Sequence, residues 1–412
     1  MKRFGLIGER LSHSYSKMLH ELLADYSYDL WPMPPERLDG FMKSGGFDGM
    51  NVTIPYKQRV IPYLSEMGET ALRIGSVNTI VKRPDGTLFG DNTDAYGMRE
   101  MARRAGIVFR GQKTLILGSG GTSLTARAVV EADGGRAVVI SRGGSNTYDT
   151  LEKHADAAYL INTTPVGMYP NTGAAAVDLT RLPGLRGVMD VIYNPLRTRL
   201  LQQAQALGIP CEGGLCMLVY QAVRACELFT GAPVALEKAQ AAEKALRRQV
   251  MNLVLVGMPG SGKSTLGSLL AKRLKLPLCD LDKEIEKEAG MSIPDIFARE
   301  GEDGFRRREA ELTARYGREG GRILVTGGGV VKNPLNRENL RLNGLVVHIM
   351  RDVDALPMNG RPLSTGRERL KAMWQERAPL YAACADVAVS NNQQPDACAR
   401  AIEEAYNEAL CN

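Results

Sequence analysis

Short apolar runs alternate along this chain with longer stretches in which apolar residues recur at helical spacing. Residues 114–117, 137–140 and 253–256 are runs of this kind, and a helical stretch follows the first and the last of them. Short apolar runs bounded by turn residues predict buried strands, and their alternation with helices is typical of parallel sheets built from βαβ units. The pattern therefore predicts an α/β protein.

The length of the chain and one abrupt change of pattern predict more than one domain. With 412 residues the chain exceeds the usual size of a single domain, so two or three domains are expected. A helix rich in Ala, Glu, Lys and Arg is predicted over residues 235–248, and the strand 253–256 follows at once. A new domain therefore begins near Met251, and a softer boundary lies near residue 100, where another helix ends.

Composition and charge argue against several classes of protein. Charged residues make up 24% of the chain, as in ordinary globular proteins, and no apolar run approaches the roughly 18 residues that cross a bilayer. The net charge of +6 lacks the one-sided basic excess of a nucleic-acid binder. The first residues read as a strand rather than a signal peptide, and the seven Cys form no CxxC pair. We therefore expect a cytoplasmic protein that binds neither nucleic acid nor membrane and holds no zinc or disulfide framework.

A glycine-rich loop follows the strand at 114–117. Gly118 permits a tight turn and Gly120 lets the backbone approach a pyrophosphate, while the next helix presents its N-terminus to the anion. Ser123 stands where this fingerprint has Gly or Ala. We predict a dinucleotide site, whose residues are Gly118, Ser119, Gly120, Gly121, Thr122, Ser141, Arg142 and Gly214.

The strand 137–140 ends in Ser141-Arg142, which bears on the choice of dinucleotide. An NAD site would place a carboxylate near this point to hold the ribose 2′-hydroxyl, whereas a guanidinium can pair bidentately with a 2′-phosphate. The sequence therefore favours NADP over NAD. A solvated surface position is the alternative for Arg142.

Four clusters of polar residues lie at predicted element ends within the first 100 residues. They are residues 13–16, 51–57, 76–79 and 90–94. Alternating hydroxyls and amides suit a ligand with several hydroxyls and a carboxylate, although each cluster alone is typical of helix caps and turns.

Together these strings resemble the shikimate dehydrogenase family over about residues 1–248. The matching strings are Ser14-Tyr15-Ser16, Asn51-Val52-Thr53-Ile54-Pro55-Tyr56-Lys57, Val77-Asn78-Thr79, Gly90-Asp91-Asn92-Thr93-Asp94, Asn162-Thr163-Thr164-Pro165-Val166-Gly167-Met168 and Gly214-Leu215-Cys216-Met217-Leu218-Val219-Tyr220-Gln221. The likeness implies that shikimate is contacted by Ser14, Ser16, Thr53, Asn78, Asp94, Tyr193 and Gln221. It also implies that Lys57 and Asp94 are the catalytic pair. An ammonium beside the ketone oxygen of 3-dehydroshikimate can stabilise the developing alkoxide and donate a proton, while a plain surface ion pair is the alternative role.

Three positions qualify this resemblance. Lys17 stands where the family usually carries Pro, and Ser141-Arg142-Gly143 stands where it often has Asn-Arg-Thr. The second departure bears only on the details of 2′-phosphate binding. Tyr193 matches a substrate contact of the family, although a Tyr after a buried strand is often a packing residue.

A second glycine loop follows the strand at 253–256. The string Gly257-Met258-Pro259-Gly260-Ser261-Gly262-Lys263-Ser264 fits the phosphate-loop pattern G-x-x-x-x-G-K-[ST], and a helix is predicted over 264–274. In such a loop backbone amides hold phosphate oxygens, the lysine reaches the β and γ phosphates, and the serine ligates Mg²⁺. The predicted ATP-binding residues of the loop are Gly260, Ser261, Gly262, Lys263, Ser264 and Thr265.

Charged residues and glycines follow further predicted strands in this part of the chain. Asp280 and Asp282 stand one residue apart at a strand end, where they would point the same way, one toward Mg²⁺ and the other toward a substrate hydroxyl. Arg306 lies in a helical charged string, which in isolation could be a solvated face. Three glycines, 327–329, follow a strand and allow a ligand to lie on bare backbone.

This second set of strings resembles the shikimate kinase family over about residues 251–412. Besides the loop, the matching strings are Asp280-Leu281-Asp282, Gly301-Glu302-Asp303-Gly304-Phe305-Arg306, Gly327-Gly328-Gly329, Gly360-Arg361-Pro362-Leu363 and Arg377-Ala378-Pro379-Leu380-Tyr381. The likeness associates Asp280, with Ser264, with Mg²⁺, and it implies that shikimate is held by Asp282, Arg306, Gly328 and Arg377. It places Arg361 in a lid that touches ATP and the transferring phosphate. Lys263, Asp282 and Arg361 are the predicted catalytic residues, with Asp282 orienting or deprotonating the 3-hydroxyl.

Two departures concern the nucleotide. The segment before Arg361 is short, which predicts a small lid, and residues 391–394 lack the Arg that often stacks on adenine. Both bear on nucleotide preference and neither on the class of reaction.

The two resemblances support each other, because the product of the first reaction is the substrate of the second. We predict a two-lobed dehydrogenase with a Rossmann-type NADP domain, followed by a phosphate-loop kinase domain with a parallel sheet like that of nucleoside monophosphate kinases. The predicted parts are a shikimate-binding lobe (1–100 and 214–248), an NADP lobe (101–213) and the kinase (251–412). The expected ligands are 3-dehydroshikimate, shikimate, NADP(H) and ATP with Mg²⁺, and a homodimer is one option for assembly.

Two alternatives stay open at this point. One is a quinate/shikimate-type dehydrogenase joined to a kinase of another small polyol, against which Arg142, Arg306 and Arg377 argue. The other is that one half is a regulatory or scaffolding module with a decayed site, against which the retained lysines and carboxylates argue. The short junction near residue 250 favours shared expression and a raised local concentration of shikimate over a tunnel.

Overall fold

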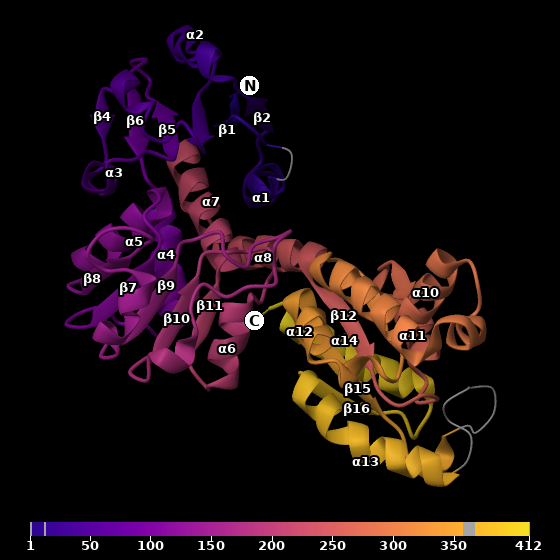
Figure 1. Cartoon of the computed structure of the whole chain (residues 1–412). Helices are drawn as coiled ribbons and strands as arrows, with labels where there is room; N and C mark the ends of the chain where they lie inside the picture. Colours follow the sequence, from indigo (N-terminus) through magenta and orange to yellow (C-terminus); the bar gives the residue numbers. More distant parts are fainter. Residues whose placement is uncertain (1, 12–13, 357–366, 412) are drawn as a thin grey trace. The chain divides into compact units, whose positions relative to one another are not determined.

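The chain forms two compact units in the computed structural model, which describes residues 2–11, 14–356 and 367–411 (Figure 1). The first unit comprises Met1–Tyr193 and Leu200–Leu246, and the second comprises Asn194–Arg199 and Arg247–Asn412. Among the described residues, no helix has the length and apolar character needed to cross a membrane. The predicted division of the first unit into two lobes stays a prediction.

The first sheet of the first unit is mixed, with the order β2-β1-β3-β5-β6-β4. Its strands are β1 (Phe4–Gly8), β2 (Tyr28–Pro32), β3 (Gly49–Val52), β4 (Glu66–Met67), β5 (Thr79–Lys82) and β6 (Leu88–Asp91). β1 runs parallel to β2 and β3, whereas β5 runs antiparallel to β3 and β6. The expectation of parallel sheets throughout was wrong here, because only five residues join β5 to β6 and a parallel crossover needs a dozen or more.

This first sheet packs against α1 (Ser16–Leu23), α2 (Leu38–Ser44), α3 (Glu69–Ile74) and α7 (Gly214–Thr230). After β6 the chain continues as α4 (Asp94–Arg104), and after α7 it continues as α8 (Leu236–Val250), which is tied to α4 by an ion pair. Ile7, Met50 and Val52 are buried on one side of the sheet, and Phe4 stacks on Phe229 of α7 on the other, with 4.9 Å between ring centroids. The returning helix α7 therefore completes the core around the first strand.

The second sheet of the first unit is entirely parallel, with the order β11-β10-β9-β7-β8. Its strands are β7 (Lys113–Leu117), β8 (Arg136–Ile140), β9 (Tyr159–Asn162), β10 (Gly187–Asp190) and β11 (Cys211–Gly213), and its helices are α5 (Gly121–Ala132) and α6 (Arg199–Ala206). From β7 the chain moves first to β8 on one side and then to β9 on the other. Such a switch point opens a crevice at the carboxyl end of the central strand. The predicted Rossmann-type arrangement is confirmed, with the glycine loop directly after β7.

The second unit contains a five-stranded parallel sheet with the order β13-β14-β12-β15-β16. Its strands are β12 (Asn252–Val256), β13 (Leu278–Asp280), β14 (Ile323–Val325), β15 (Gly344–Met350) and β16 (Val387–Ser390). Its helices are α9 (Lys263–Leu274), α10 (Leu281–Ala289), α11 (Ile293–Arg318), α12 (Pro334–Asn343), α13 (Arg367–Cys384) and α14 (Pro395–Ala409). Short 3₁₀ turns complete the chain at Pro35–Arg37, Ile61–Tyr63, Tyr148–His154, Leu179–Arg181, Val330–Lys332 and Val353–Ala355.

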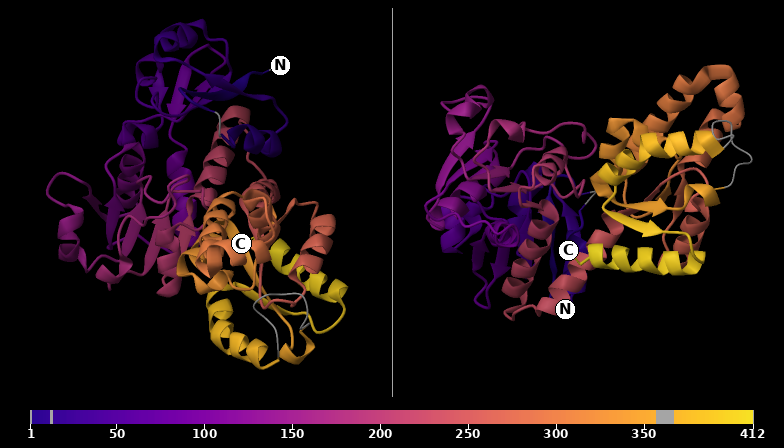
Figure 2. Two further views of the ribbon diagram at one scale, coloured as in Figure 1. Left: turned by 45° about the vertical axis from the view of Figure 1, so that its right-hand side comes forward. Right: turned by 90° about the horizontal axis from the view of Figure 1, so that it is seen from below.

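Alternate residues of the central strand β12 enter two different cores. Val254 and Val256 pack with α10, α11 and α13, whereas Leu253 and Leu255 pack with α9 and α14. Successive strand residues point to opposite faces, so a strand covered on both faces reads as one continuous apolar run. Figure 2 shows α13 and α14 on opposite sides of these strands. The predicted parallel kinase-type sheet is confirmed as a three-layer arrangement.

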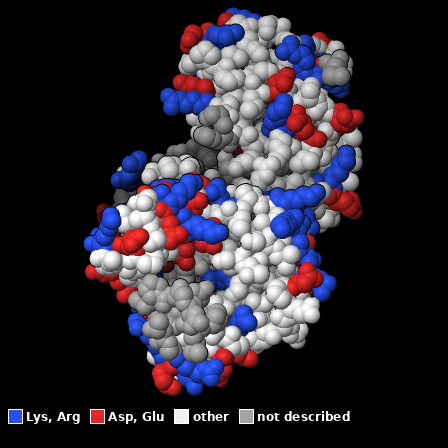
Figure 3. Space-filling view, turned by 90° about the vertical axis from the view of Figure 1, so that its right-hand side faces the viewer, with Lys and Arg blue, Asp and Glu red and all other residues white. Residues whose placement is uncertain are grey.

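Charges of both signs share the surface. On the face of the molecule drawn in Figure 3, Lys and Arg side chains lie among Asp and Glu side chains and form no single continuous basic area.

A buried ion pair fixes α8 within the first unit. Both Arg104 terminal nitrogens donate to the two oxygens of Glu243 at 2.7 Å, and Arg104 also donates to the Tyr220 hydroxyl at 3.2 Å. The side chain of Glu243 is 6% exposed, so its negative charge is buried and is compensated by the Arg104 guanidinium. Ala239, Ala242 and Leu246 of the same helix are buried.

We expect Glu243→Ala to lower the free energy of unfolding of the first unit by about 2 kcal/mol, because the Arg104 guanidinium loses two short charged hydrogen bonds and is left with the longer contact to Glu100, whose Oε1 lies 3.5 Å from Arg104 Nε. The chain has two Trp, of which Trp31 lies in the first unit and Trp374 in the second. Urea unfolding followed by fluorescence in a Trp374→Phe background therefore reports on the first unit alone. Glu237→Ala, at an exposed position of the same helix, is the matched control, and an equal effect of the two variants would contradict the assignment.

Candidate active sites

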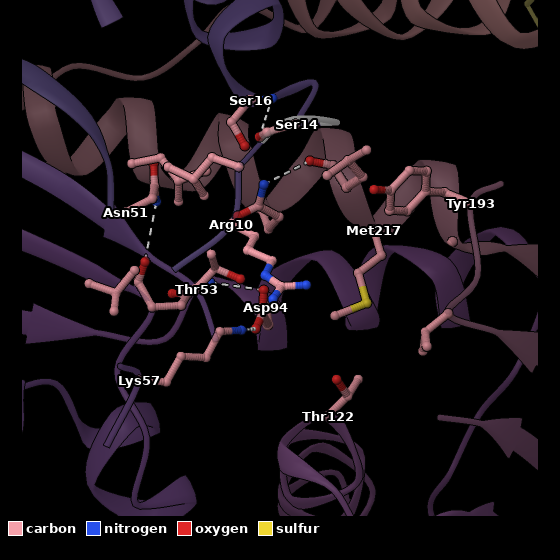
Figure 4. A pocket seen from close by; sticks show the side chains of 18 residues that line it. Arg10, Ser14, Ser16, Asn51, Thr53, Lys57, Asp94, Thr122, Tyr193 and Met217 are labelled. Atoms are coloured by element: carbon pink, nitrogen blue, oxygen red, sulfur yellow. Dashed lines mark hydrogen bonds and ion pairs between the residues drawn. The ribbon is translucent and has the colours of Figure 1, made fainter. Parts of the chain in front are cut away.

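A cavity of about 660 Å³ lies in the first unit, at the ends of β1 and β3 and the beginnings of α4, α5 and α7 (Figure 4). It brings together the predicted catalytic Lys57, all seven predicted substrate residues and two of the predicted dinucleotide residues. The substrate residues are Ser14, Ser16, Thr53, Asn78, Asp94, Tyr193 and Gln221, and the dinucleotide residues are Thr122 and Gly214. The other predicted dinucleotide residues lie outside its lining.

Lys57 and Asp94 form an ion pair in this cavity. Lys57 follows β3, and its carbonyl accepts the backbone N–H of Val77 at 2.8 Å, which ties the loop to the segment before β5. Asp94 is the first residue of α4, where the helix dipole favours a negative charge. Lys57 Nζ lies 2.6 Å from Asp94 Oδ2, and the two side chains are 26% and 14% exposed. The pair is shielded but still open to a ligand in the cavity.

Asn78 fixes the second oxygen of that carboxylate. Its Nδ2 donates to Asp94 Oδ1 at 2.8 Å, while its Oδ1 accepts the backbone N–H of Thr93 at 2.7 Å. Because a backbone N–H can only donate, this contact sets which way round the Asn78 amide lies. The Asp94 carboxylate is thus held by an ammonium on one oxygen and by an amide on the other.

A buried residue that sequence reasoning did not place in the site supports Asn78. Asn51 of β3 accepts the Tyr28 hydroxyl at 2.7 Å and donates to Thr79 Oγ1 at 3.0 Å. Thr79 Oγ1 in turn donates to Asn78 Oδ1 at 3.0 Å. Asn51 is the first residue of the string that ends in Lys57. An asparagine inside an apolar strand was the sequence signal that could have predicted a buried polar network here.

The opposite wall of the cavity carries hydroxyls and an amide. Ser14 Oγ accepts the backbone N–H of Ser16 at 3.2 Å at the beginning of α1, and Gln221 donates to the carbonyl of Leu218 at 3.0 Å. The Tyr193 ring meets Tyr15 edge-on at 6.1 Å between centroids. Burial raises the pKa of the Tyr193 hydroxyl, so it stays a neutral hydrogen-bonding group. Arg10 also lines this cavity and was not predicted as a site residue.

The glycine loop after β7 leaves room for an anion at the N-terminus of α5. Gly118 has φ +102°, and a Cβ there would lie 3.0 Å from the Thr164 methyl group. Apart from the adjoining residues and the backbone of α5 itself, no atom of the described residues lies within 4 Å of where a Cβ would stand on Gly120 or Gly121, and none of their side chains caps the helix. Ser123 is 3% exposed, so its departure from the fingerprint is accommodated inside the unit. The loop and the free helix N-terminus fit a pyrophosphate.

Arg142 stands beyond the end of β8 on an exposed loop, beside this nucleotide crevice. Ser141 donates its hydroxyl to the carbonyl of Gly143 and pairs with Thr147 as an isolated bridge, which shapes the loop that carries Arg142. The positive charge of Arg142 lowers the pKa of the Tyr148 hydroxyl, although burial raises that pKa more. The guanidinium is therefore available to a ligand.

A second cavity, of about 340 Å³, lies in the second unit. Eight predicted residues line it, namely Gly260, Lys263, Ser264, Asp280, Asp282, Arg306, Gly328 and Arg377. Ser261, Gly262 and Thr265 belong to the same phosphate loop outside this lining, and Arg361 lies outside the described residues. The cavity therefore joins the phosphate loop to the two predicted acceptor-binding arginines.

The phosphate loop holds its lysine folded back on its own backbone. Lys263 Nζ donates to the carbonyls of Gly257 and Met258 at 2.9 and 3.0 Å. Gly262 has φ +97°, and a Cβ there would lie 2.4 Å from Nδ2 of Asn391, which donates to the carbonyl of Ser261 at 2.7 Å. The buried Ser261 hydroxyl has no hydrogen-bond partner within the described part of the chain. These features fit a loop preformed for phosphate.

Ser264 and Asp280 provide an oxygen donor set at the loop. Ser264 Oγ donates to Asp280 Oδ2 at 3.2 Å, and hydroxyl and carboxylate oxygens are ligands that Mg²⁺ accepts. The expected geometry of the two aspartates was wrong. Asp280 caps α10 by accepting the N–H of Asp282, so Asp282 lies in the first helical turn rather than two places along a strand. Both still line the cavity, because the helix begins at the strand end.

Arg306 is held by a carboxylate that was not among the predicted site residues. Arg306 Nη1 lies 2.7 Å from Glu309 Oε2, and the Glu309 side chain is 2% exposed. Burial raises the pKa of Glu309, while Arg306 lowers it and the neighbouring Asp282 raises it further. The spacing of three residues on a helix was the signal that could have revealed this pair. Glu309 orients the Arg306 guanidinium at the cavity wall.

Gly328 is fixed by two residues of α13 at the floor of the cavity. Its carbonyl accepts from Arg377 Nη1 at 3.1 Å and from the Tyr381 hydroxyl at 2.5 Å. Tyr381 stacks on His348 of β15, with centroids 4.8 Å apart, and His348 stacks on Trp374 at 6.0 Å. This aromatic stack, Trp374–His348–Tyr381, connects α13 to the sheet beneath the glycine turn.

Comparison with known proteins decides the family of the first unit. The model of the "Shikimate dehydrogenase substrate binding domain" matches residues 6–80. The NADP(+) shikimate dehydrogenase of Clostridium perfringens (strain SM101) is 36% identical over 256 residues, which cover 57% of this chain and 94% of that protein. The chain belongs to the shikimate dehydrogenase family. Its remaining part matches the shikimate kinase family model over residues 259–407, so a kinase domain is fused to the dehydrogenase.

Solved structures agree with this assignment. The shikimate 5-dehydrogenase of Thermus thermophilus, in complex with NADP(H) and shikimate, is 32% identical, with a TM-score of 0.53, covering 59% of this chain and 98% of that one. The quinate dehydrogenase of Corynebacterium glutamicum, in complex with NAD, is 28% identical, with a TM-score of 0.54, covering 58% of this chain and 98% of that one. Together with the match to the shikimate kinase family model, these findings show that the chain carries both an oxidoreductase and a phosphotransferase unit.

We expect the kinase unit to lose stability as pH falls, through His348, the histidine of this unit. Burial and the charge of Lys263 lower the pKa of His348 from 6.5 to about 4. Between these two pKa values the imidazole of His348 is protonated in the unfolded chain and neutral in the folded unit, so a fall in pH favours unfolding. The stability present above pH 6.5 is therefore lost between about pH 6.5 and pH 4. Between pH 7.5 and pH 5 the loss is about 2 kcal/mol.

His348→Phe keeps an aromatic ring in the stack and removes this titration. Urea unfolding at pH 7.5 and pH 5, followed by Trp374 fluorescence in a Trp31→Phe background, measures the second unit alone. The variant should lose about 2 kcal/mol less than its parent over this interval. An equal loss in both proteins would contradict the prediction.

Proposed function

We propose that the first unit reduces 3-dehydroshikimate to shikimate with NADPH, and that the second transfers the γ-phosphoryl group of ATP to the 3-hydroxyl of that shikimate. The observation that carries the proposal is that one chain joins members of two families whose names share this compound. The two cavities support it. The first joins polar groups suited to a small hydroxylated acid to Thr122 at the end of the dinucleotide loop, and the second joins charged groups suited to such an acid to the phosphate loop.

In the dehydrogenase, the chain's own residues manage the proton and the orientation of the substrate. NADPH, when bound, supplies the hydride that adds to the ketone carbon. Lys57 donates a proton to the ketone oxygen as that bond forms, and its positive charge stabilises the developing alkoxide. Asp94 keeps the ammonium in place and accepts a hydrogen bond from a substrate hydroxyl, while Asn78 prevents the carboxylate from turning away.

The remaining polar wall binds the rest of the substrate. Ser14, Ser16, Thr53, Tyr193 and Gln221 offer neutral donors and acceptors, as the ring hydroxyls and the carboxylate require. For the dinucleotide, the loop from Gly118 to Thr122 holds the pyrophosphate, and Gly214, which lies against the Val191 carbonyl, keeps the cavity open because it has no side chain. Ser141 and Arg142 hold the 2′-phosphate of NADP.

In the kinase, Arg306 and Arg377 bind the carboxylate of shikimate and Gly328 offers bare backbone to its ring. Asp282 orients the 3-hydroxyl and takes its proton as the new oxygen–phosphorus bond forms and ADP leaves. Lys263 moves from its loop carbonyls to the β and γ phosphates when ATP binds. Ser264 and Asp280 would hold Mg²⁺, which would supply positive charge beside the phosphates. Arg361 is proposed to reach the transferring phosphate from the lid.

A quinate- and NAD-dependent first activity is the alternative that a specific observation favours. The chain resembles a quinate dehydrogenase in complex with NAD about as closely as it resembles shikimate dehydrogenases of known structure. Arg142 after β8 supports NADP instead. A cytoplasmic location, a homodimer and a raised local concentration of shikimate, rather than a tunnel, remain parts of the proposal that come from the sequence.

A coupled assay tests both activities at once. With 3-dehydroshikimate, NADPH and Mg-ATP, we expect oxidation of NADPH followed by formation of shikimate 3-phosphate. Lys57→Ala should lower the first rate by roughly 10²-fold or more and leave phosphorylation of added shikimate intact, because it removes the proton donor. Lys263→Ala should do the reverse, because it removes a phosphate contact. Lys43→Ala and Lys272→Ala, at exposed positions, are the matched controls.

Loss of both activities in either single variant would contradict two independent sites. Failure of the wild-type chain to form shikimate 3-phosphate from added shikimate and Mg-ATP would overturn the kinase assignment alone.

The choice of dinucleotide is tested at Arg142. Arg142→Ala should raise the KM for NADP⁺ by roughly tenfold and leave the KM for NAD⁺ unchanged, because a charged hydrogen bond to the 2′-phosphate is lost. Arg136→Ala is the control, because Arg136 is exposed at the beginning of β8, the strand that precedes Arg142. The measurement uses shikimate and quinate in parallel. Preference of the wild type for NAD⁺ and quinate would establish the alternative.

A further inference from the structure

The first cavity has an unbalanced charge. Among its lining residues in the described part of the chain, three are charged, namely Arg10, Lys57 and Asp94. Lys57 and Asp94 lie 2.6 Å apart and neutralise each other. The lining therefore carries a net charge of +1, and that charge belongs to Arg10.

Arg10 stands on the loop that follows β1 and precedes Ser14. Its side chain makes no hydrogen bond or ion pair with any described residue, and it is exposed. In Figure 4 it extends from this loop into the cavity toward the Lys57–Asp94 pair. The backbone N–H of Ser14 donates to the carbonyl of Leu11 at 3.2 Å, and Leu11 and Ser14 both line the cavity together with Arg10.

We infer that Arg10 is the counter-ion of the substrate carboxylate in the dehydrogenase. This inference rests on the proposed function, since 3-dehydroshikimate and shikimate each carry one negative charge at neutral pH, which matches the +1 of the lining. The planar guanidinium binds a carboxylate through two parallel N–H groups, which fixes the orientation of the ring as well as its affinity. The Ser14 and Ser16 hydroxyls complete the donors around that carboxylate.

In this proposal the Lys57–Asp94 pair and Arg10 have separate tasks. The pair acts on the reacting oxygen, whereas Arg10 selects substrates that carry a carboxylate and fixes the orientation of the substrate ring. Loss of Arg10 therefore weakens binding of the anionic substrate and leaves the chemistry of the bound substrate in place. An uncharged substrate of the same shape gains nothing from Arg10.

The experiment compares Arg10→Gln and Arg10→Lys with the wild-type chain in the oxidation of shikimate by NADP⁺. We expect Arg10→Gln to raise the KM for shikimate by roughly tenfold, with kcat and the KM for NADP⁺ changed less than twofold. Arg10→Lys should recover part of the loss, because it restores the positive charge but not the two parallel N–H groups of the guanidinium. Arg37→Gln, which removes an exposed positive charge of the same unit outside the cavity, should leave all three constants unchanged.

The methyl ester of shikimate separates a charge contact from a structural effect. The ester should be a weaker substrate than shikimate for the wild type, and its KM should be the same for the wild type and for Arg10→Gln. A structural defect would instead weaken both substrates alike, and that result would overturn the inference.

Two further results would also overturn it. A rise in the KM for NADP⁺ as large as that for shikimate would place Arg10 on the cofactor phosphates, and an unchanged KM for shikimate would leave Arg10 without a role. Turnover of shikimate by the wild type is measured in the same assay. Its absence would reject the proposed function itself, whereas wild-type turnover with unaffected Arg10 variants would reject only this inference.

Discussion

The carboxyl ends of the parallel strands are the constraint on which both sites depend. A parallel sheet turns all its strand ends toward one edge, and each following helix begins there with unpaired N–H groups. Lys57 follows β3, the dinucleotide loop follows β7, the phosphate loop follows β12 and the glycine turn follows β14. Residues far apart in sequence therefore meet at these edges, and the helix N-termini give each edge a preference for anions.

Much of this could be predicted because the signals are local. A phosphate loop is a contiguous string whose backbone conformation its glycines dictate, and Lys57 and Asp94 each stand in a string of their own. Contacts between elements were harder to foresee. The antiparallel β5–β6 pair depends on a short connection, Asp282 lies on a helix because Asp280 caps it, and Arg10 is one charged residue in an exposed loop whose place at the cavity only the fold reveals.

Buried ion pairs recur where the chain must hold an arginine still. Glu243 holds Arg104 between helices, and Glu309 holds Arg306 at the wall of the kinase cavity. A buried pair adds little net stability compared with apolar packing, but breaking it is costly, so it fixes geometry more than it adds free energy. In the dehydrogenase the same logic applies to Asp94, which Lys57 and Asn78 hold from two sides.

The stacking of Phe4 on Phe229 sets an order of events during synthesis. The first strand of the chain packs against a helix that lies more than 200 residues later, so the core around β1 is incomplete until α7 has left the ribosome. At about 5–20 residues per second, that interval lasts roughly 10–40 s. During this time the apolar side of the first sheet is open to chaperones and to neighbouring chains. The kinase sequence begins to emerge from the ribosome soon after α7 has covered that side of the sheet.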